Sequence, residues 1–268
     1  MISKFSAQDI MPSASGFLIV GPAGSGKTQL AADMAELGKT LILYTDLKAG
    51  KPTYKKSPNL ANIDIWEFQD IASPVASGNA TEELSNAITE LLTIPREEFP
   101  YKLIWLDSLT STGDIVLQWA VAANAMKGVG GDHKFGDGST GSLCPNLPDY
   151  GTQLNQIKYM INRLLLLPCI VGVIAHERDV YNKDGYMVEK VIDITGRESY
   201  ARNIASRFSE IYRAYQKNDP ITNKNTWEMS TTGNDIYPWC CSKGLEAPNI
   251  INGFQDIKSL MQKQLNIK

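Results

Sequence analysis

Short apolar runs alternate along this chain with longer amphipathic segments, a pattern typical of an α/β protein with a largely parallel sheet. Runs that are apolar nearly throughout predict buried strands at residues 16–20, 40–46, 101–107 and 168–175. Polar and apolar residues alternate over 62–68, which indicates a half-exposed strand. Helical spacing between these runs predicts helices over residues 29–37, 80–92, 108–127 and 152–167. We therefore predict a mainly parallel, twisted sheet flanked by helices.

The final third has shorter elements. Its β patterns cover residues 187–192, 208–215, 225–230 and 236–242, with polar turns between them. A short helix is predicted over 197–207, and a closing helix begins at Phe254 or Gln255. We expect the late strands to extend the same sheet as antiparallel hairpins. The expected organisation is thus one domain over 1–268, with a lead-in at 1–15 and a C-terminal tail helix within 243–268.

Between the first strand and the first helix lies a motif with specific chemistry. Residues 21–28 read GPAGSGKT and fit G-x-x-x-x-G-K-[ST], the phosphate-binding P-loop. Glycines let the backbone approach phosphates closely, and the N–H groups at the helix start face the anion. Lys27 is expected to reach the β- and γ-phosphates and Thr28 to ligate Mg²⁺. The predicted nucleotide contacts are Gly21, Pro22, Ala23, Gly24, Ser25, Gly26, Lys27, Thr28 and Gln29, with ATP and Mg²⁺ as cofactors.

Three other predicted strands end in polar side chains: Asp46, Asp107 and His176, which Glu177 follows. In doubly wound sheets the ligand lies beyond the carboxyl ends of the strands, so we expect these groups to meet the P-loop in one crevice. Asp107 is the predicted partner of Thr28 in holding Mg²⁺, and Asp46 is its rival. His176 is interpreted either as a sensor of the γ-phosphate or as a loop histidine satisfied by local hydrogen bonds.

Two polar stretches remain open to more than one interpretation. Residues 47–59 are basic, and they form either a solvated connection or a contact to nucleotide or nucleic acid. Residues 126–147 are rich in glycine and have no apolar period, which predicts a mobile loop. That loop is either a plain surface loop or a segment that orders on a polymer ligand. In the second case Lys127, His133, Lys134 and Phe135 would contact DNA.

Composition narrows the class of protein further. The chain has 268 residues and a formal net charge of −3, so DNA binding would depend on local basic patches. Its four cysteines form no CxxC pair and no signal peptide is apparent, which favours free thiols in a reducing cytoplasm. The longest apolar stretch, Leu164 to Ala175, is too short to span a bilayer and contains Pro168. We therefore expect a cytoplasmic protein without a membrane partner.

The order of these features resembles the core of RecA-type recombinases. More narrowly, it is similar to small phage-encoded ATPases of the RecA-like, single-strand-annealing kind. The segments that carry the resemblance are 21–28, 103–108, 149–151, 171–177 and 241–243. The resemblance implies ATP hydrolysis, assembly into a ring or filament, and action on single-stranded DNA in recombination, annealing or replication, in the host cytoplasm if the protein is phage-encoded. Lys243 stands where some relatives place a cation that reaches a neighbouring subunit's nucleotide.

The chain also departs from that pattern. Relatives often have a water-polarising glutamate two residues after the position of Asp46, and here Lys48 stands there. Ser108 follows Asp107, so no glutamate is supplied there either, and Asp46 or Glu177 would have to orient the attacking water. Relatives often have a basic residue two positions after that of Lys243, and here Leu245 stands there. Two alternatives therefore stay open: a nucleotide-gated assembly protein with little turnover, and a small-molecule or nucleotide kinase, although the arginines are too scattered for a typical lid.

Overall fold

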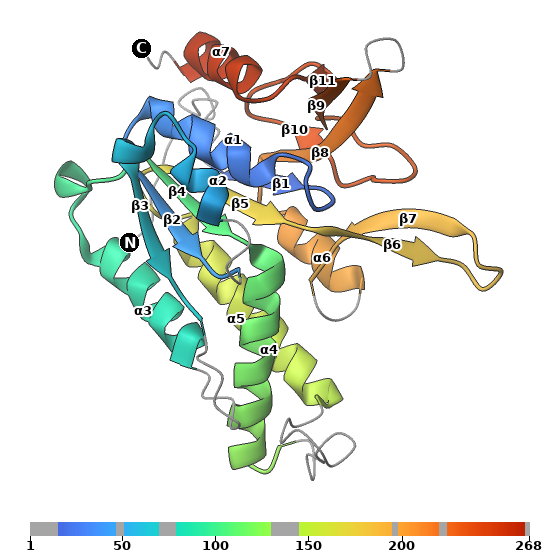
Figure 1. The fold of residues 1–268 in the computed structure, drawn as a ribbon. Coiled ribbons are helices and arrows are strands. Elements are labelled where there is room, and N and C mark those ends of the chain that lie inside the picture. Colours follow the sequence, from blue (N-terminus) through green and yellow to red (C-terminus); the bar gives the residue numbers. More distant parts are fainter. Residues whose placement is uncertain are drawn as a thin grey trace, which may run out of the picture.

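The computed structural model describes residues 16–46, 51–69, 79–129, 145–194, 198–219 and 224–265. Within them the main sheet has nine strands (Figure 1), in the order β11-β9-β8-β1-β5-β4-β2-β3, with β10 paired to β8. The first five strands along the chain are β1 Gly16–Val20, β2 Thr40–Tyr44, β3 Ile63–Glu67, β4 Leu103–Asp107 and β5 Ile170–Ala175. The later ones in this sheet are β8 Glu210–Asp219, β9 Lys224–Ser230, β10 Cys241–Ser242 and β11 Ile250–Ile251.

The centre of the sheet is parallel. Strand β1 pairs in parallel with β5 on one side and β8 on the other, and β5, β4, β2 and β3 follow in parallel. Every residue of β1, β2 and β4 is buried, as expected for apolar strands covered on both faces. Strand β3 at the edge is half-exposed, as its alternating pattern predicted. The antiparallel pairs are β8–β9, β8–β10 and β9–β11 in the C-terminal third. The predicted α/β fold class, a mainly parallel sheet flanked by helices with antiparallel strands in the C-terminal third, is confirmed.

Helices cover the two faces of this sheet unequally. On one face lie α3 Asn79–Thr93, α4 Leu109–Met126, α5 Leu147–Leu164 and α6 Glu198–Ala205, whose apolar residues share one core cluster with Leu18 and Val20. On the other lie α1 Lys27–Met34, α2 Lys51–Lys55 and α7 Phe254–Leu265, clustered with Phe17 and Ile19. Alternate residues of β1 therefore enter opposite cores, because successive side chains of a strand point to opposite faces. Short 3₁₀ turns occur at Ala35–Leu37, Leu60–Asn62 and Arg96–Glu98.

Three sequence expectations were wrong in detail. The basic stretch 47–59 was expected to be a loop, but its described part contains helix α2. The helix expected to begin at residue 152 begins at Leu147 as α5, because Asn146 and Asp149 form a capping box there and the proline at 148 is compatible with a helix start. The strand expected over 236–242 is reduced to the two residues of β10.

The late strands were expected to extend the sheet as antiparallel hairpins. Strands β8 and β9 do form such a hairpin in the main sheet, although β8 joins β1 in parallel. Strand β7, Met187–Ile192, pairs instead with β6, Glu177–Tyr181, in a separate antiparallel hairpin that leaves the sheet directly after β5 (Figure 1). Sequence reasoning missed β6 because its charged residues resemble a loop. Among the described residues, no helix is both long and apolar enough to cross a bilayer.

Candidate functional site

The turn between β1 and α1 has the backbone geometry that the P-loop motif predicts. Gly24 and Gly26 have φ values of 77° and 84°, a region that favours glycine. A Cβ atom on Gly21 would lie 2.1 Å from the carbonyl oxygen of Ala214 on β8. Glycine is therefore required at positions 24 and 26 by the backbone conformation, and at position 21 by close packing against β8.

Lys27 lies inside this loop. Its side chain is buried, and Nζ donates to the carbonyl oxygens of Gly21 (2.8 Å) and Pro22 (2.7 Å) and to Ser25 Oγ (3.4 Å). Burial lowers the pKa of Lys27 to about 8, although the nearby carboxylates of Asp107, Glu177 and Asp46 act to raise it. An ammonium group held this way is desolvated, so it interacts strongly with any anion placed in the loop.

Thr28 and Asp107 meet, as predicted. Thr28 Oγ1 donates to Asp107 Oδ2 at 3.2 Å, and Tyr54 Oη donates to the same oxygen at 2.7 Å. Burial raises the pKa of Asp107 to about 6; the Asp46 charge adds to this shift, whereas the hydroxyls of Tyr54 and Thr28 and the Lys27 charge oppose it. A hydroxyl and a carboxylate beside a phosphate-binding loop are the oxygen donors that Mg²⁺ prefers, so these residues fit the ion.

Asp46 lies close to Asp107 but has different partners. Its Oδ1 accepts hydrogen bonds from Ser108 Oγ at 2.8 Å and from Ser111 Oγ. Both serines come from the start of α4, so the end of β2 is tied to the segment that follows β4. Asp46 also lines the pocket around the P-loop. Its carboxylate thus lies near the Thr28–Asp107 pair and is held by the two serine hydroxyls.

His176 lines the same pocket. Its backbone N–H donates to Thr110 Oγ1 at 2.9 Å, and its carbonyl accepts from the N–H of Asp193 at 2.8 Å. Burial lowers the pKa of the imidazole and the Lys27 charge adds to this, while Asp46 and Asp193 oppose it. The ring is therefore neutral near pH 7 and can donate through one nitrogen.

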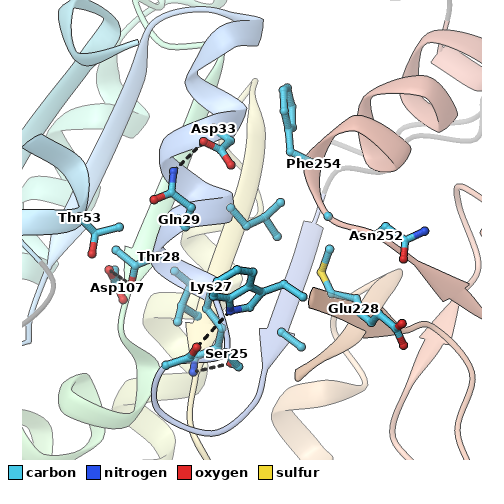
Figure 2. Close-up of a pocket in the computed structure, with 18 of the residues that line it drawn as sticks. Ser25, Lys27, Thr28, Gln29, Asp33, Thr53, Asp107, Glu228, Asn252 and Phe254 are labelled. Atoms are coloured by element: carbon cyan, nitrogen blue, oxygen red, sulfur yellow. Dashed lines mark hydrogen bonds between the residues drawn. The ribbon is translucent and has the colours of Figure 1, made fainter. Parts of the chain in front are cut away.

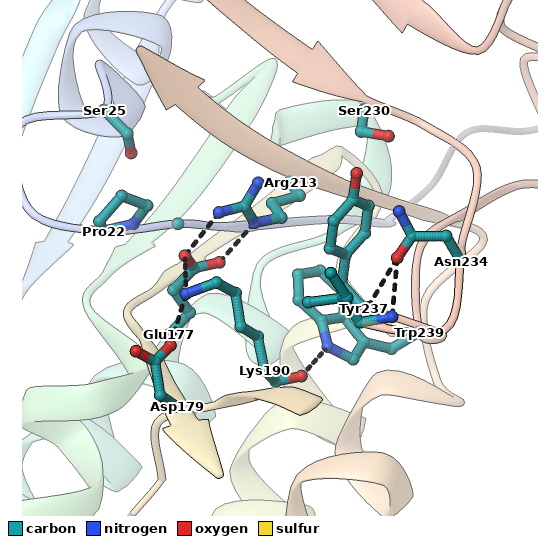
Figure 3. A network of polar contacts seen from close by, with 12 residues as sticks. Pro22, Ser25, Glu177, Asp179, Lys190, Arg213, Ser230, Asn234, Tyr237 and Trp239 are labelled. Atoms are coloured by element: carbon teal, nitrogen blue, oxygen red, sulfur yellow. Dashed lines mark hydrogen bonds and ion pairs between the residues drawn. The ribbon is translucent and has the colours of Figure 1, made fainter. Parts of the chain in front are cut away.

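Glu177, the next residue, is held in an ion-pair network. Its two oxygens accept from Nε and Nη2 of Arg213 at 2.7 and 2.8 Å (Figure 3). Lys190 Nζ lies 3.5 Å from Glu177 and also pairs with Asp179. The Glu177 side chain is only 4% exposed and does not line the pocket. Its carboxylate is therefore already neutralised, which favours a structural role beneath the P-loop over orientation of water.

Replacing Glu177 with glutamine is expected to destabilise the fold by about 3 kcal/mol, because it leaves Arg213 and Lys190 without their shared anion. Turnover per folded molecule should fall by less than about tenfold, well short of the loss expected for a general base. Urea unfolding and phosphate release check the two effects. Glu189→Gln is the matched control, since its partner Arg202 is largely exposed and surface pairs contribute little. A large loss of turnover with unchanged stability would contradict this assignment.

The P-loop, Asp46, Asp107 and His176 line one pocket with a volume of about 1080 Å³. Figure 2 shows that it extends to both sides of α1: Asp107 and Thr53 lie on one side, and Asn252 and Phe254 on the other. Gln29, predicted as a contact, lines it and donates to Asp33 Oδ1 at 2.7 Å. Sequence reasoning missed the lining residues that come from α2, β9 and the start of α7. They carry no motif, and only the tertiary fold brings them to the P-loop.

Of the residues predicted to contact DNA or a neighbouring subunit, the structure describes Lys127 and Lys243. Lys127 is exposed at the C-terminal end of α4, and Lys243 is exposed just after β10; neither lines the pocket. His133, Lys134 and Phe135 lie outside the described residues, as does Lys48. The structure therefore leaves these assignments as predictions.

The two shifted pKa values predict a bell-shaped pH dependence for binding of a magnesium nucleotide. Below about 6, Asp107 takes up a proton and no longer attracts the metal; above about 8, Lys27 loses its charge and no longer attracts phosphate. Affinity for a non-hydrolysable ATP analogue with Mg²⁺ should therefore be highest between these limits. Calorimetric titrations from pH 5 to 9 check this. Metal-free inorganic triphosphate is the control, and its affinity should not show the fall at low pH that protonation of Asp107 causes. A flat profile would contradict it.

Comparison with known proteins agrees with this geometry. A family model described as "AAA domain" matches residues 14–236. The chain belongs to this AAA-domain family. Membership supports nucleotide binding and hydrolysis, and residues 14–236 of this AAA domain include the P-loop, Asp46, Asp107 and His176.

Comparison with solved structures gives a weaker similarity. The crystal structure of flagellar accessory protein FlaH from Methanocaldococcus jannaschii is similar to this AAA domain with a TM-score of 0.40 and 11% identity, over 82% of this chain and 78% of that one. No curated protein matches the sequence.

Proposed function

We propose that the protein binds ATP with Mg²⁺ and hydrolyses it, and that it couples this reaction to single-stranded DNA. The observation that carries the ATPase part is the contact between Thr28 and Asp107 beside the buried Lys27. A hydroxyl, a carboxylate and a desolvated cation around one glycine-rich turn are the groups that hold a metal-bound triphosphate. The family match supports the same class of reaction.

Each residue has a role that follows from its position. The loop amides and Lys27 would bind and orient the phosphates, while Thr28 and Asp107 would hold Mg²⁺, which offsets phosphate charge when bound. Asp46, fixed by two serine hydroxyls, would orient the attacking water. The neutral imidazole of His176 would hydrogen-bond near the terminal phosphate and connect it to the β6–β7 hairpin, which begins at the next residue.

Turnover is expected to be slow. Among the described residues that line the pocket beside Thr28, the carboxylates are Asp46 and Asp107. Asp107 is engaged with Thr28 and Tyr54, and Asp46 already accepts hydrogen bonds from two serine hydroxyls, so both carboxylates are occupied by protein partners. This arrangement favours a second candidate function, a nucleotide-gated assembly protein in which binding matters more than hydrolysis.

The DNA part rests on the resemblance to RecA-type proteins and on the basic and aromatic residues Lys127, His133, Lys134 and Phe135. Self-association into a ring or filament, with Lys243 reaching a neighbouring subunit's nucleotide, rests on the same resemblance. The net charge of −3 gives no general attraction to nucleic acid, so any contact must be local.

One combined experiment tests the proposal. Phosphate release is measured with and without single-stranded DNA, beside size-exclusion chromatography with a non-hydrolysable ATP analogue. DNA-stimulated release supports the full proposal, and DNA binding should weaken with rising salt if phosphates are contacted. Analogue-dependent assembly with negligible release selects the assembly protein. Phosphate transfer to a nucleoside monophosphate would instead show a kinase and overturn the proposal.

A further inference from the structure

The pocket continues beyond the P-loop into an apolar slot. We call it the aromatic slot: Leu30 on α1, Trp227 and Met229 on β9, and Phe254 at the start of α7. Leu30, Met229 and Phe254 are largely buried, whereas Trp227 is 50% exposed. Helix α7 packs against α1 through its buried residues Ile257 and Met261, and Lys258 forms an ion pair with Glu36 in the 3₁₀ turn that follows α1. Three side chains of the slot are therefore held in place by packing, and the fourth, Trp227, is accessible to a ligand.

Trp227 is fixed to the P-loop although it is half exposed. Its indole N–H donates to the carbonyl oxygen of Gly24 at 3.2 Å. Its ring also lies against Gly26, where an added Cβ would come within 2.8 Å of Trp227 Cδ1. An exposed aromatic side chain held at one edge offers a pre-organised surface, so a flat ligand that stacks on it pays little conformational entropy.

The arrangement of the pocket sets the direction of a bound nucleotide. Asp107 and Thr53 lie on one side of α1, and Asp107 accepts a hydrogen bond from Thr28. This is the side where the metal and the terminal phosphates would bind. Asn252 and Phe254 lie on the other side of α1 (Figure 2). A triphosphate held by the loop with its terminal phosphate toward Asp107 must extend its sugar and base away from that carboxylate, which directs the base toward the aromatic slot.

We propose that Trp227 is the stacking surface for the base of the bound nucleoside triphosphate, and that the aromatic slot favours a purine over a pyrimidine. This inference rests on the proposed nucleotide binding. Stacking strength grows with ring area, and base–aromatic stacks contribute measurably to affinity. Apart from Leu30, the slot residues come from β9 and α7, segments without any nucleotide-binding motif, so base selection depends largely on parts of the chain remote in sequence from the P-loop.

The test compares Trp227→Ala and Trp227→Phe with the parent, using ATP, CTP and inorganic triphosphate as ligands in calorimetric titrations. Trp227→Ala should bind ATP about tenfold more weakly and lose the preference for ATP over CTP. Its affinity for inorganic triphosphate should be unchanged, because that ligand has no base. Trp227→Phe should recover most of the ATP affinity, since it keeps a stacking ring without the indole N–H.

Other outcomes separate the two proposals. Equal weakening of ATP and inorganic triphosphate by Trp227→Ala would mean that the indole only shapes the loop, and unchanged ATP affinity would mean that it does not contact the base; either overturns this inference and leaves nucleotide binding intact. A parent protein that binds neither ligand overturns both proposals. Tryptophan fluorescence gives a second readout. ATP should quench it in the parent and in the control variant Trp119→Phe, which removes an indole that hydrogen-bonds to Glu82. ATP should not quench it in Trp227→Phe.

Discussion

Replacement of Lys27 with alanine is expected to reduce ATP hydrolysis by at least about a hundredfold, the scale of effect seen when a charge-stabilising donor is lost from a dry site. Nζ is buried among the carbonyl oxygens of Gly21 and Pro22, and this burial, which also lowers its pKa, leaves it poorly solvated by water. A poorly solvated cation interacts strongly with phosphate, and no neighbouring lysine in the pocket replaces it among the described residues. Calorimetry should also show loss of binding to inorganic triphosphate.

The matched control for this variant is Lys102→Ala. Lys102 is exposed and precedes β4, at the opposite end of the strand from Asp107, so its removal should leave hydrolysis and binding unchanged. Circular dichroism checks that both variants fold. If Lys27→Ala hydrolyses ATP as fast as Lys102→Ala, the P-loop assignment is wrong.

Asp107→Asn is expected to have a comparable effect on turnover by a different route. The substitution keeps the shape of the side chain but removes the charge that attracts Mg²⁺ next to Thr28. Hydrolysis should fall by about a hundredfold or more, and affinity for the ATP analogue should no longer rise when Mg²⁺ is added. Affinity for metal-free inorganic triphosphate should be retained, because Lys27 and the loop remain.

Stability gives an independent check on the same variant. The folded-state pKa of Asp107, about 6, lies above its ordinary value of 3.8, so its contribution to stability is fully present below pH 3.8 and is lost as pH rises through 6. Relative to Asp107→Asn, the parent should therefore lose stability over that range in urea unfolding. Asp184→Asn, at the exposed tip of the β6–β7 hairpin, is the matched control for the substitution itself. An Asp107→Asn protein with intact magnesium dependence would remove this residue from the metal site.

At the level of the fold, local pattern predicted the central elements well. The strands β1, β2, β4 and β5 are continuous apolar runs because both their faces are covered, and such runs are visible in sequence. The start of α5 and the short helix α2 were not visible, because a capping box beside proline and a basic segment both resemble loops. Strand β7 was predicted, but β6 and its pairing with β7 were missed for a similar reason: β6 is rich in charged residues, and the hairpin lies outside the main sheet.

At the level of the site, the sequence by itself determined the P-loop and the strand ends that carry Asp46, Asp107 and His176, because a motif and a strand terminus are local features. Only the tertiary structure decided what those groups contact. It placed Glu177, at the start of β6, against Arg213 on β8, and it brought Trp227 onto the P-loop from about 200 residues away. Such contacts depend on the order of strands in the sheet, and strand order follows from packing of the whole chain, which no local pattern encodes.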